Sequence, residues 1–261
     1  MKPIAMICFL LCCCTWKIEA KQDNSTPSPI SFVFSQDDFY PLVYQDVDGF
    51  CKRKGIYIDV IELIFIQQLK LDVTCHSLPW QRAQHSVKRG RYDVFFAPLT
   101  HERLSYATAS QLPVYNMLMR LYSYQEHKKL SEIETIQSVD DIIALELIAV
   151  SNAGNGWYKD NVEAYGVKTV YVKSDEHMFR FLAQQRADVL IDTELSSDKV
   201  INRIGLNSQI VKTQVLVGQV DFYLLLSNKS PYLFLLPKIN QAIQTLIDNG
   251  QLAKIIANYR S

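Results

Sequence analysis

The chain has 261 residues, with 27 basic and 27 acidic side chains that give a formal net charge of zero at pH 7. This balance argues against a protein that binds nucleic acid through a strongly basic surface, so we predict no nucleic-acid partner. The length suits one large domain or two medium ones, and apolar residues make up 48% of the chain, which is ample for buried cores.

The first 20 residues have the features of a secretory signal peptide. Lys2 supplies a positive start, residues 4–16 form an apolar run, and Ala20 is a small residue at a suitable cleavage point. The apolar run is shorter than the ~20 residues that a membrane-spanning helix needs, so a retained anchor is the less favoured alternative. We therefore predict an exported, periplasmic protein from which residues 1–20 are removed.

Three cysteines in this segment leave a lipoprotein anchor as a further, less favoured alternative. Cys12, Cys13 and Cys14 each follow a leucine or a cysteine, not the small residue usual before a lipidated cysteine. Residues 21–29 are polar and contain two prolines, so they cannot bury a core and we expect a flexible leader.

The first half of the remaining chain alternates strand and helix patterns. The patterns predict a strand over residues 30–34, a helix over 58–69, a strand over 71–75, a helix over 80–89 and a strand over 92–96. Strand–helix repeats of this length indicate parallel sheets with helices on both faces.

The second half continues the alternation after a longer apolar strand. We predict strands over 114–122, 145–150, 169–172, 189–192 and 220–226, and helices that begin after Ser138, over 156–165, from Ser174 to Gln185, and over 236–249 up to Gly250. The polar stretch 123–134 marks a crossing into a second lobe, and the strand over 220–226 marks the return. The predicted first lobe is residues 30–118 with 220–261, and the second lobe is residues 119–219.

Two cysteines remain beyond the predicted signal peptide. Cys51 precedes the first helix and Cys75 ends the strand that follows it. An even pair in an oxidising compartment favours one disulfide, with two separate buried thiols as the alternative. Closing a loop of this length would stabilise the fold by ~3 kcal/mol in the loop-entropy description.

Four predicted loops follow strands and are candidates for a binding cleft. They cover residues 37–44, 97–103, 151–156 and 192–194. In open α/β sheets, ligands bind beyond the carboxyl ends of the strands at a topological switch point, so all four loops can face one cleft.

The loop over 97–103 carries the most informative residue. Arg103 follows a short apolar strand, where a guanidinium can meet an anion bidentately. For an isolated arginine, a surface ion pair with Glu102 or Asp93 is the commoner arrangement.

The sequence around Arg103 resembles the family 3 bacterial solute-binding proteins, periplasmic receptors for polar amino acids. The matching positions are Gly90, Asp93, Thr100, Arg103, Ser110, Pro113 and Tyr115, together with residues 48–60 and the closing segment 239–259. The resemblance covers roughly residue 30 to the end of the chain. It implies a type II periplasmic-binding-protein fold of the α/β class. Each of its two lobes is a mainly parallel sheet flanked by helices, and a two-strand hinge joins them.

The resemblance also implies a function. Such a protein captures an amino acid or similar small carboxylate in the cleft between its lobes and presents it to an inner-membrane ABC permease. We predict a monomer without a cofactor or metal. Arg103 and Thr100 would bind the ligand carboxylate, and the N–H groups around Ser151, Asn155 and Gly156 would add a second anchor. An ordinary turn with an asparagine cap is the alternative for that loop.

The remaining site predictions concern the ligand ammonium and the walls. Asp192 is the candidate for the ammonium, although its spacing from Asp188 is one residue shorter than the family pattern. Thr193 or Glu194 is therefore an alternative in that role, and a plain helix cap is an alternative for Asp192. The predicted aromatic walls of the cleft are Tyr40 and Trp80.

One position departs from the family pattern. Pro98 stands where amino-acid receptors commonly have a small hydroxyl residue, and proline offers no donor. The lost hydrogen bond to a charged group would cost about 1.5–3 kcal/mol. A dicarboxylate, an opine-like compound or a small peptide fragment therefore stays open as the ligand.

Two other classes of function stay open beside the receptor. The sequence has no zincin, nucleophile-elbow, phosphate-loop or Cys-x-x-Cys motif, and its five histidines are scattered, so we predict that it is not an enzyme. Some relatives on this fold dehydrate cyclic acids in the periplasm, which makes such an enzyme one alternative. A ligand-sensing accessory module for a membrane partner is the other.

Overall fold

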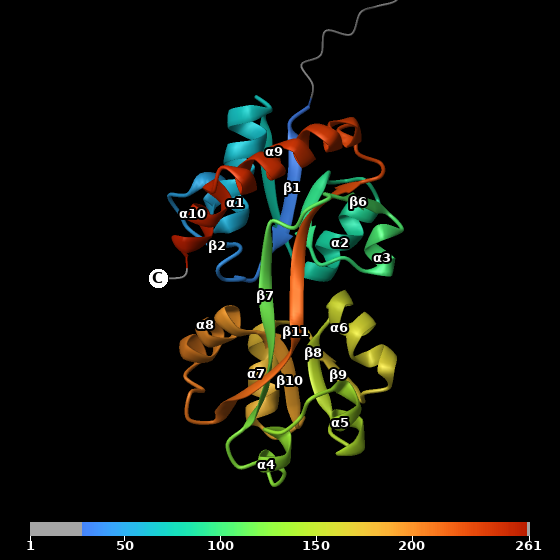
Figure 1. Cartoon of the computed structure of the whole chain (residues 1–261), viewed down its shortest axis with the longest axis vertical. Helices are drawn as coiled ribbons and strands as arrows, with labels where there is room; N and C mark the ends of the chain where they lie inside the picture. Colours follow the sequence, from blue (N-terminus) through green and yellow to red (C-terminus); the bar gives the residue numbers. More distant parts are fainter. Residues whose placement is uncertain (1–27, 260–261) are drawn as a thin grey trace, which may run out of the picture.

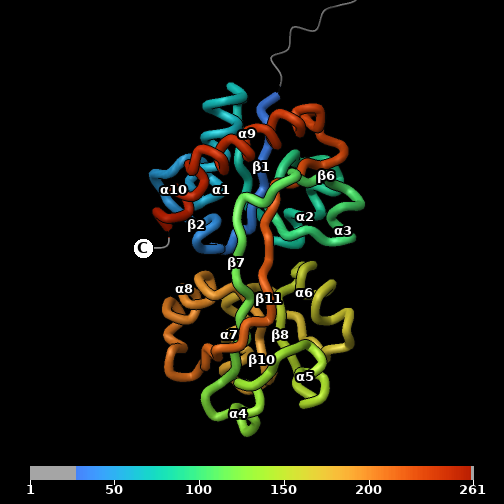
Figure 2. The backbone as a smooth tube through the Cα atoms, in the orientation of Figure 1, coloured from blue at the N-terminus to red at the C-terminus, as the bar shows by residue number. Residues whose placement is uncertain are grey.

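The structure, a computed structural model, describes residues 28–259 and has two lobes joined by two long strands. These strands are β7 (Tyr115–Tyr124) and β11 (Ile210–Ser227), which run side by side from one lobe to the other (Figures 1 and 2). The arrangement confirms the predicted two-lobe α/β fold. The predicted signal peptide and most of the predicted leader lie outside the described residues.

The first lobe is built around β1 (Ile30–Ser35). This strand pairs in parallel with β4 (Val73–Leu78) and β5 (Val94–Ala97), and β5 pairs antiparallel with β11. The short β6 (Ala107–Ala109) also pairs with β11. The carboxyl ends of β1 and β5 therefore point toward the second lobe.

Helices cover both faces of this sheet because side chains alternate along its strands. Phe32 and Phe34 pack in one core, while Val33 packs in a second core with Phe95. The first core is covered by α1 (Ile56–Ile61), the π-helical segment η2 (Glu62–Gln68), α9 (Leu236–Asp248) and α10 (Gln251–Ala257). The second core is covered by α2 (Trp80–Lys88).

The second lobe has a smaller sheet. Its strands β8 (Ala149–Asn152), β9 (Thr169–Val172) and β10 (Val189–Thr193) are parallel, and β10 also pairs antiparallel with β7. The flanking helices are α4 (Leu130–Ile133), α5 (Val139–Ala144), α6 (Gly156–Asn161), α7 (Asp175–Ala183) and α8 (Glu194–Ile204). Strands β8 and β10 end on the side of the second lobe that faces the first lobe (Figure 1).

The structure departs from the predicted elements in three places. The strand predicted over 145–150 starts only at Ala149, because Glu146 has a φ of 55° and closes a turn after α5. The strand predicted over 220–226 begins at Ile210, since β11 pairs with β7 through the second lobe as well as the first. The helix predicted over 156–165 breaks at Val162, whose ψ of −59° accompanies a φ of −130°, into α6 and a 3-10 turn.

The predicted disulfide is confirmed. Cys51 lies in the 3-10 turn η1 (Phe50–Lys52) and bonds to Cys75 of β4, with a Cα–Cα distance of 5.5 Å. This distance is in the usual range for a disulfide, and the bond ties the segment before α1 to the sheet. Among the helices of residues 28–259, none combines the length and the apolar character needed to cross a bilayer.

Candidate functional site

The four predicted loops contribute to one cavity between the lobes. The first lobe lines it with side chains that follow β1 and β5, and the second lobe with side chains that follow β8 and β10. The polar and charged residues of its wall are Ser35, Asp37, Arg103, Asn152, Asn155, Lys173, Asp175, Asp192 and Thr193. The prediction that these loops share a cleft is therefore confirmed.

Arg103 lies at the first-lobe side of this cavity and is 2% exposed. Thr100 begins α3 (His101–Leu104), and its hydroxyl accepts a hydrogen bond from the backbone N–H of Arg103 at 3.1 Å. The guanidinium donates to three neutral acceptors: Oε1 of Gln84 at 2.9 Å, the carbonyl oxygen of Pro98 at 2.9 Å and that of Gly154 at 3.4 Å. The last of these bonds crosses from the first lobe to the second.

The hydrogen bonds of Arg103 leave donors for a ligand. A guanidinium has five N–H groups, and the three bonds use one each from Nε, Nη1 and Nη2. One N–H on each terminal nitrogen remains, which is the fork that binds a carboxylate bidentately. Burial lowers the pKa of Arg103 to about 10, so the group is still charged at neutral pH. Within residues 28–259 it forms no ion pair.

Trp80 is the predicted aromatic residue that the structure places in the wall. Its ring centroid lies 5.6 Å from the guanidinium carbon of Arg103, within the range of a cation–π contact. Pro98, which stands where the family pattern has a hydroxyl donor, also lines the cavity. Its carbonyl oxygen accepts a hydrogen bond from Arg103 and so orients the guanidinium.

Tyr40, the other predicted aromatic, does not line the cavity. Its hydroxyl donates to the carbonyl oxygen of Tyr259 at 2.6 Å, and Nζ of Lys199 lies 4.6 Å from its ring centroid. The neighbouring Phe39 takes the place in the wall, because the turn closed by Phe39 and Val43 directs that ring toward Phe222. The sequence alone could not distinguish two adjacent rings in one turn.

The predicted loop over 151–156 brings the second lobe close to Arg103. Asn155 lines the cavity, and its side chain caps α6 by accepting from the backbone N–H of Tyr158 at 3.1 Å. A Cβ on Gly156 would lie 3.0 Å from Cγ2 of Thr100, so a larger residue here would require Thr100 to shift. Ser151 is buried beneath the loop, where it accepts from Nδ2 of Asn155, and it does not line the cavity.

Thr100 and Gly156 line a second pocket, which shares Ala153 and Asn155 with the cavity. Thr100 contributes to the cavity through the helix cap that positions Arg103. Of the residues predicted to bind the ligand carboxylate, Arg103 and Asn155 line the cavity itself.

Asp192 ends β10 in the second-lobe wall of the cavity. It is 9% exposed, and its Oδ2 accepts from the Ser197 hydroxyl at 3.0 Å. Burial raises its pKa to about 6. Thr193 lines the cavity beside it, whereas Glu194 does not.

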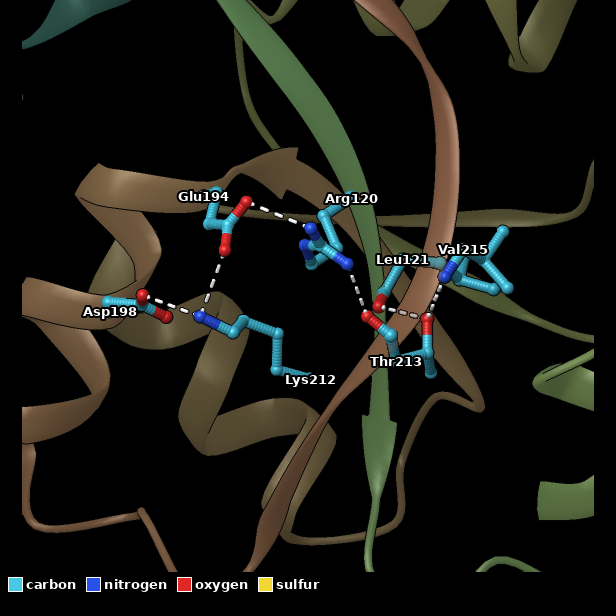
Figure 3. A network of polar contacts seen from close by, with 7 residues as sticks. All are labelled: Arg120, Leu121, Glu194, Asp198, Lys212, Thr213 and Val215. Atoms are coloured by element: carbon cyan, nitrogen blue, oxygen red, sulfur yellow. Dashed lines mark hydrogen bonds and ion pairs between the residues drawn. The ribbon is translucent and has the colours of Figure 1, made fainter.

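Glu194 is held in a network at the base of the hinge (Figure 3). Its carboxylate contacts Arg120 of β7 at 3.0 Å and Lys212 of β11 at 3.0 Å, and Lys212 also contacts Asp198 at 2.8 Å. Arg120 donates in addition to the carbonyl oxygen of Thr213 at 2.7 Å. This network neutralises Glu194 and ties the start of α8 to both hinge strands. Of the two neighbouring candidates, Asp192 lines the cavity and Glu194 does not.

Sequence reasoning missed a second acid in the wall. Asp175 begins α7, and Oδ1 accepts from Nδ2 of Asn152 at 2.6 Å. Burial, together with the nearby charge of Asp192, raises its pKa to about 7. In the sequence, an acid directly after the Ser174 cap looks like an ordinary helix start. Its position beyond the carboxyl end of β9 was the signal that could have found it.

The comparisons with known proteins agree with this geometry. The sequence model for bacterial extracellular solute-binding proteins, family 3, matches residues 32–261. No curated protein matches the chain.

Solved structures of three kinds share the fold. A mutant of ArgBP from T. maritima has a TM-score of 0.69 and 16% identity, with 88% of this chain and 94% of that chain covered. An amino acid ABC transporter substrate-binding protein from Streptococcus pneumoniae, bound to L-arginine, has a TM-score of 0.67 and 19% identity, with 88% and 93% covered. A histidine kinase sensor domain with similarity to periplasmic binding proteins has a TM-score of 0.72 and 16% identity, with 88% and 95% covered.

Proposed function

This chain belongs to the bacterial extracellular solute-binding proteins, family 3, and we propose that it is a periplasmic receptor that captures an amino acid between its lobes. The ligand carboxylate binds the two remaining N–H groups of Arg103, and the ligand ammonium binds Asp192. The closed receptor, a monomer, then delivers the ligand to an ABC permease. The protein has no catalytic role in this scheme and needs no cofactor.

The observation that carries the proposal is the buried, unpaired charge of Arg103. A buried charge is costly unless it is paired, and the neutral acceptors around this guanidinium leave the charge uncompensated. An anionic ligand group would supply the missing partner. Because hinge closure excludes water from the cleft, the same contact is stronger in the closed form than in an open one.

A binding screen tests this proposal. Purified protein is mixed with each L-amino acid and with small carboxylates, and thermal unfolding and calorimetric titration are measured. A ligand at 100 times its dissociation constant should add about 2.7 kcal/mol to the free energy of unfolding. Mass spectrometry of the recovered compound checks that it is unchanged, which separates a receptor from an enzyme.

Arg103→Ala is the decisive variant in this screen. We expect a loss of ~2–5 kcal/mol in binding free energy, because the ligand carboxylate would be buried without its partner. Arg89→Ala, at an exposed position after α2, is the matched control and should bind as the wild type does. Unchanged affinity in Arg103→Ala would overturn the assigned role of the guanidinium.

A ligand-sensing module is the second candidate, and it is favoured by the likeness to a histidine kinase sensor domain. Both candidates bind a small molecule in the same cleft and differ in the membrane partner that reads the closed form. Ligand-dependent uptake into vesicles that carry the permease would support the receptor.

A further inference from the structure

The charges in the cavity do not match those of a simple amino acid. An α-amino acid brings one carboxylate and one ammonium, which the proposed function assigns to Arg103 and Asp192. The wall also contains the carboxyl groups of Asp37 and Asp175, against the single further cation of Lys173. With three carboxylates against the two cations Arg103 and Lys173, the cavity wall has one negative charge that a zwitterion, which has no net charge, leaves unbalanced.

Asp175 is a carboxyl group of the second-lobe wall that lacks a cationic partner. Its only hydrogen bond within the described chain is the 2.6 Å contact with the neutral amide of Asn152, and in residues 28–259 it has no ion pair. The nearby cations are otherwise engaged or exposed. Arg53 and Arg203 each lie 3.7 Å from the carboxylate of Asp38, and Lys173 is exposed to solvent.

Two further polar groups in the same wall lack partners. Oδ1 of Asn152 and Oγ1 of Thr193 are buried and have no hydrogen bond within the described residues, and Thr193 is only 2% exposed. A carboxylate oxygen and an amide oxygen both accept hydrogen bonds, and a hydroxyl can also accept them. The group that satisfies all of them is a cation with several N–H donors.

An inorganic cation fits this place poorly. No set of three or more histidine, cysteine, aspartate or glutamate side chains in residues 28–259 has the arrangement of a metal site. The Asn152 amide also points its N–H toward Asp175, which orients the carboxylate for a further hydrogen-bond donor.

We infer that the cleft selects amino acids with a second cationic group at the end of the side chain, and that Asp175 and Asn152 bind this group. The inference rests on the proposed function, since it assumes that Arg103 and Asp192 hold the α-carboxylate and the α-ammonium. Asp175 begins α7 just after β9, and Asp192 belongs to β10; β9 and β10 lie on either side of β8, and both acids line the same cavity.

A matched pair of ligands tests this inference directly. L-arginine and L-citrulline have nearly the same shape, but citrulline carries a neutral ureido group where arginine carries a guanidinium. Calorimetric titration of the wild-type protein should give a dissociation constant at least tenfold lower for arginine. L-lysine against L-glutamine provides a second pair with an ammonium as the cation.

The variant Asp175→Asn assigns the preference to a residue. We expect the ratio of the two dissociation constants to fall toward one, because arginine loses the charged partner of its guanidinium and citrulline has no charge there to lose. Asp140→Asn, at an exposed position in α5, is the control and should keep the wild-type ratio. The wild-type ratio stays informative even if Asp175→Asn fails to fold.

The outcomes distinguish a failure of this inference from a failure of the proposed function. Equal affinity of the wild type for arginine and citrulline, or an unchanged ratio in folded Asp175→Asn, would overturn the inference while neutral amino acids still bind through Arg103. Absence of binding by any amino acid would overturn the proposed function itself.

Discussion

The two sides of the cleft hold buried charge in opposite ways. On the first-lobe side, Arg103 is fixed by three hydrogen bonds to neutral acceptors and stays charged. On the second-lobe side, Asp175 and Asp192 lie near each other, and their pKa values are raised toward neutrality. The first-lobe side thus holds a guanidinium that is always charged. The second-lobe side holds two acids whose charge depends on what occupies the cleft.

This difference has a consequence for the ligand-free protein. The hydrogen bonds of Arg103 stabilise the contact between the lobes, because Gly154 accepts from both Arg103 and Gln84. The two acids repel each other when both are ionised, so they destabilise the empty cleft. Binding and stability should therefore respond differently to changes on the two sides.

The largest effect that we expect in this comparison comes from Asp192→Asn. The substitution keeps the size of the side chain but removes the charge that we propose pairs with the ligand ammonium, so binding should weaken by ~2–5 kcal/mol. The ligand-free variant should be at least as stable as the wild type, since one of two repelling carboxylates is gone.

Thermal unfolding and calorimetric titration of Asp192→Asn and Arg103→Ala side by side check this contrast. Arg103→Ala should lose stability along with binding, because Oε1 of Gln84 and the carbonyl oxygen of Pro98 lose their donor and Gly154 keeps only its bond from Gln84. A marked loss of stability in ligand-free Asp192→Asn would show that the two sides do not differ in this way.

The next effect is the pH dependence of stability without ligand. The pKa values of Asp175 and Asp192 rise from the ordinary 3.8 to about 7 and about 6. The folded protein therefore binds protons that the unfolded chain has released, and the free energy of unfolding should fall as pH rises from about 4 to about 7. Arg103 does not contribute in this window, because its pKa is about 10.

Urea unfolding at several pH values measures this dependence. Many other groups titrate, so the informative quantity is the difference between the wild type and Asp175→Asn. We expect the wild type to lose roughly 1–3 kcal/mol more than the variant across the window. Parallel curves would mean that Asp175 is ionised throughout.

The smallest effect should come from Gly156→Ala, at the point where the two sides touch. The added methyl group would lie 3.0 Å from Cγ2 of Thr100 and 3.4 Å from Nη2 of Arg103. We expect ligand affinity to weaken by ~1–2 kcal/mol, because the second lobe can no longer approach the guanidinium as closely. Calorimetric titration checks this, with Gly218→Ala as the control, since a Cβ there meets nothing within 4 Å. Equal affinities of the two variants would contradict the importance of this close approach.

The sequence predicted the parts of the site that depend on local pattern. A guanidinium one turn after a buried strand, a threonine cap before it and loops at the ends of parallel strands are all short-range features. The structure places Arg103, Trp80, Asn155 and Asp192 at one cavity, as expected from those features. Thr100 and Gly156 support the cavity from the adjoining pocket, and Ser151 lies beneath the loop.

Contacts between distant parts of the chain decided the features that local pattern left open or misplaced. Tyr40 is held outside the cavity by the carbonyl group of Tyr259, 219 residues away. Glu194, an open alternative to Asp192, is held outside the cavity by Arg120 and Lys212, which come from the two hinge strands. β11 is longer than predicted because its first half finds a partner in β7.

The sequence by itself determined the alternation of strands and helices, the disulfide and the charged residue of the first lobe, because periodicity, caps and loop position are properties of neighbouring residues. Only the tertiary structure decided which acids face the cavity and which ring lines it. Those choices depend on burial and on partners that lie far away in the sequence, and neither has a trace in the local pattern.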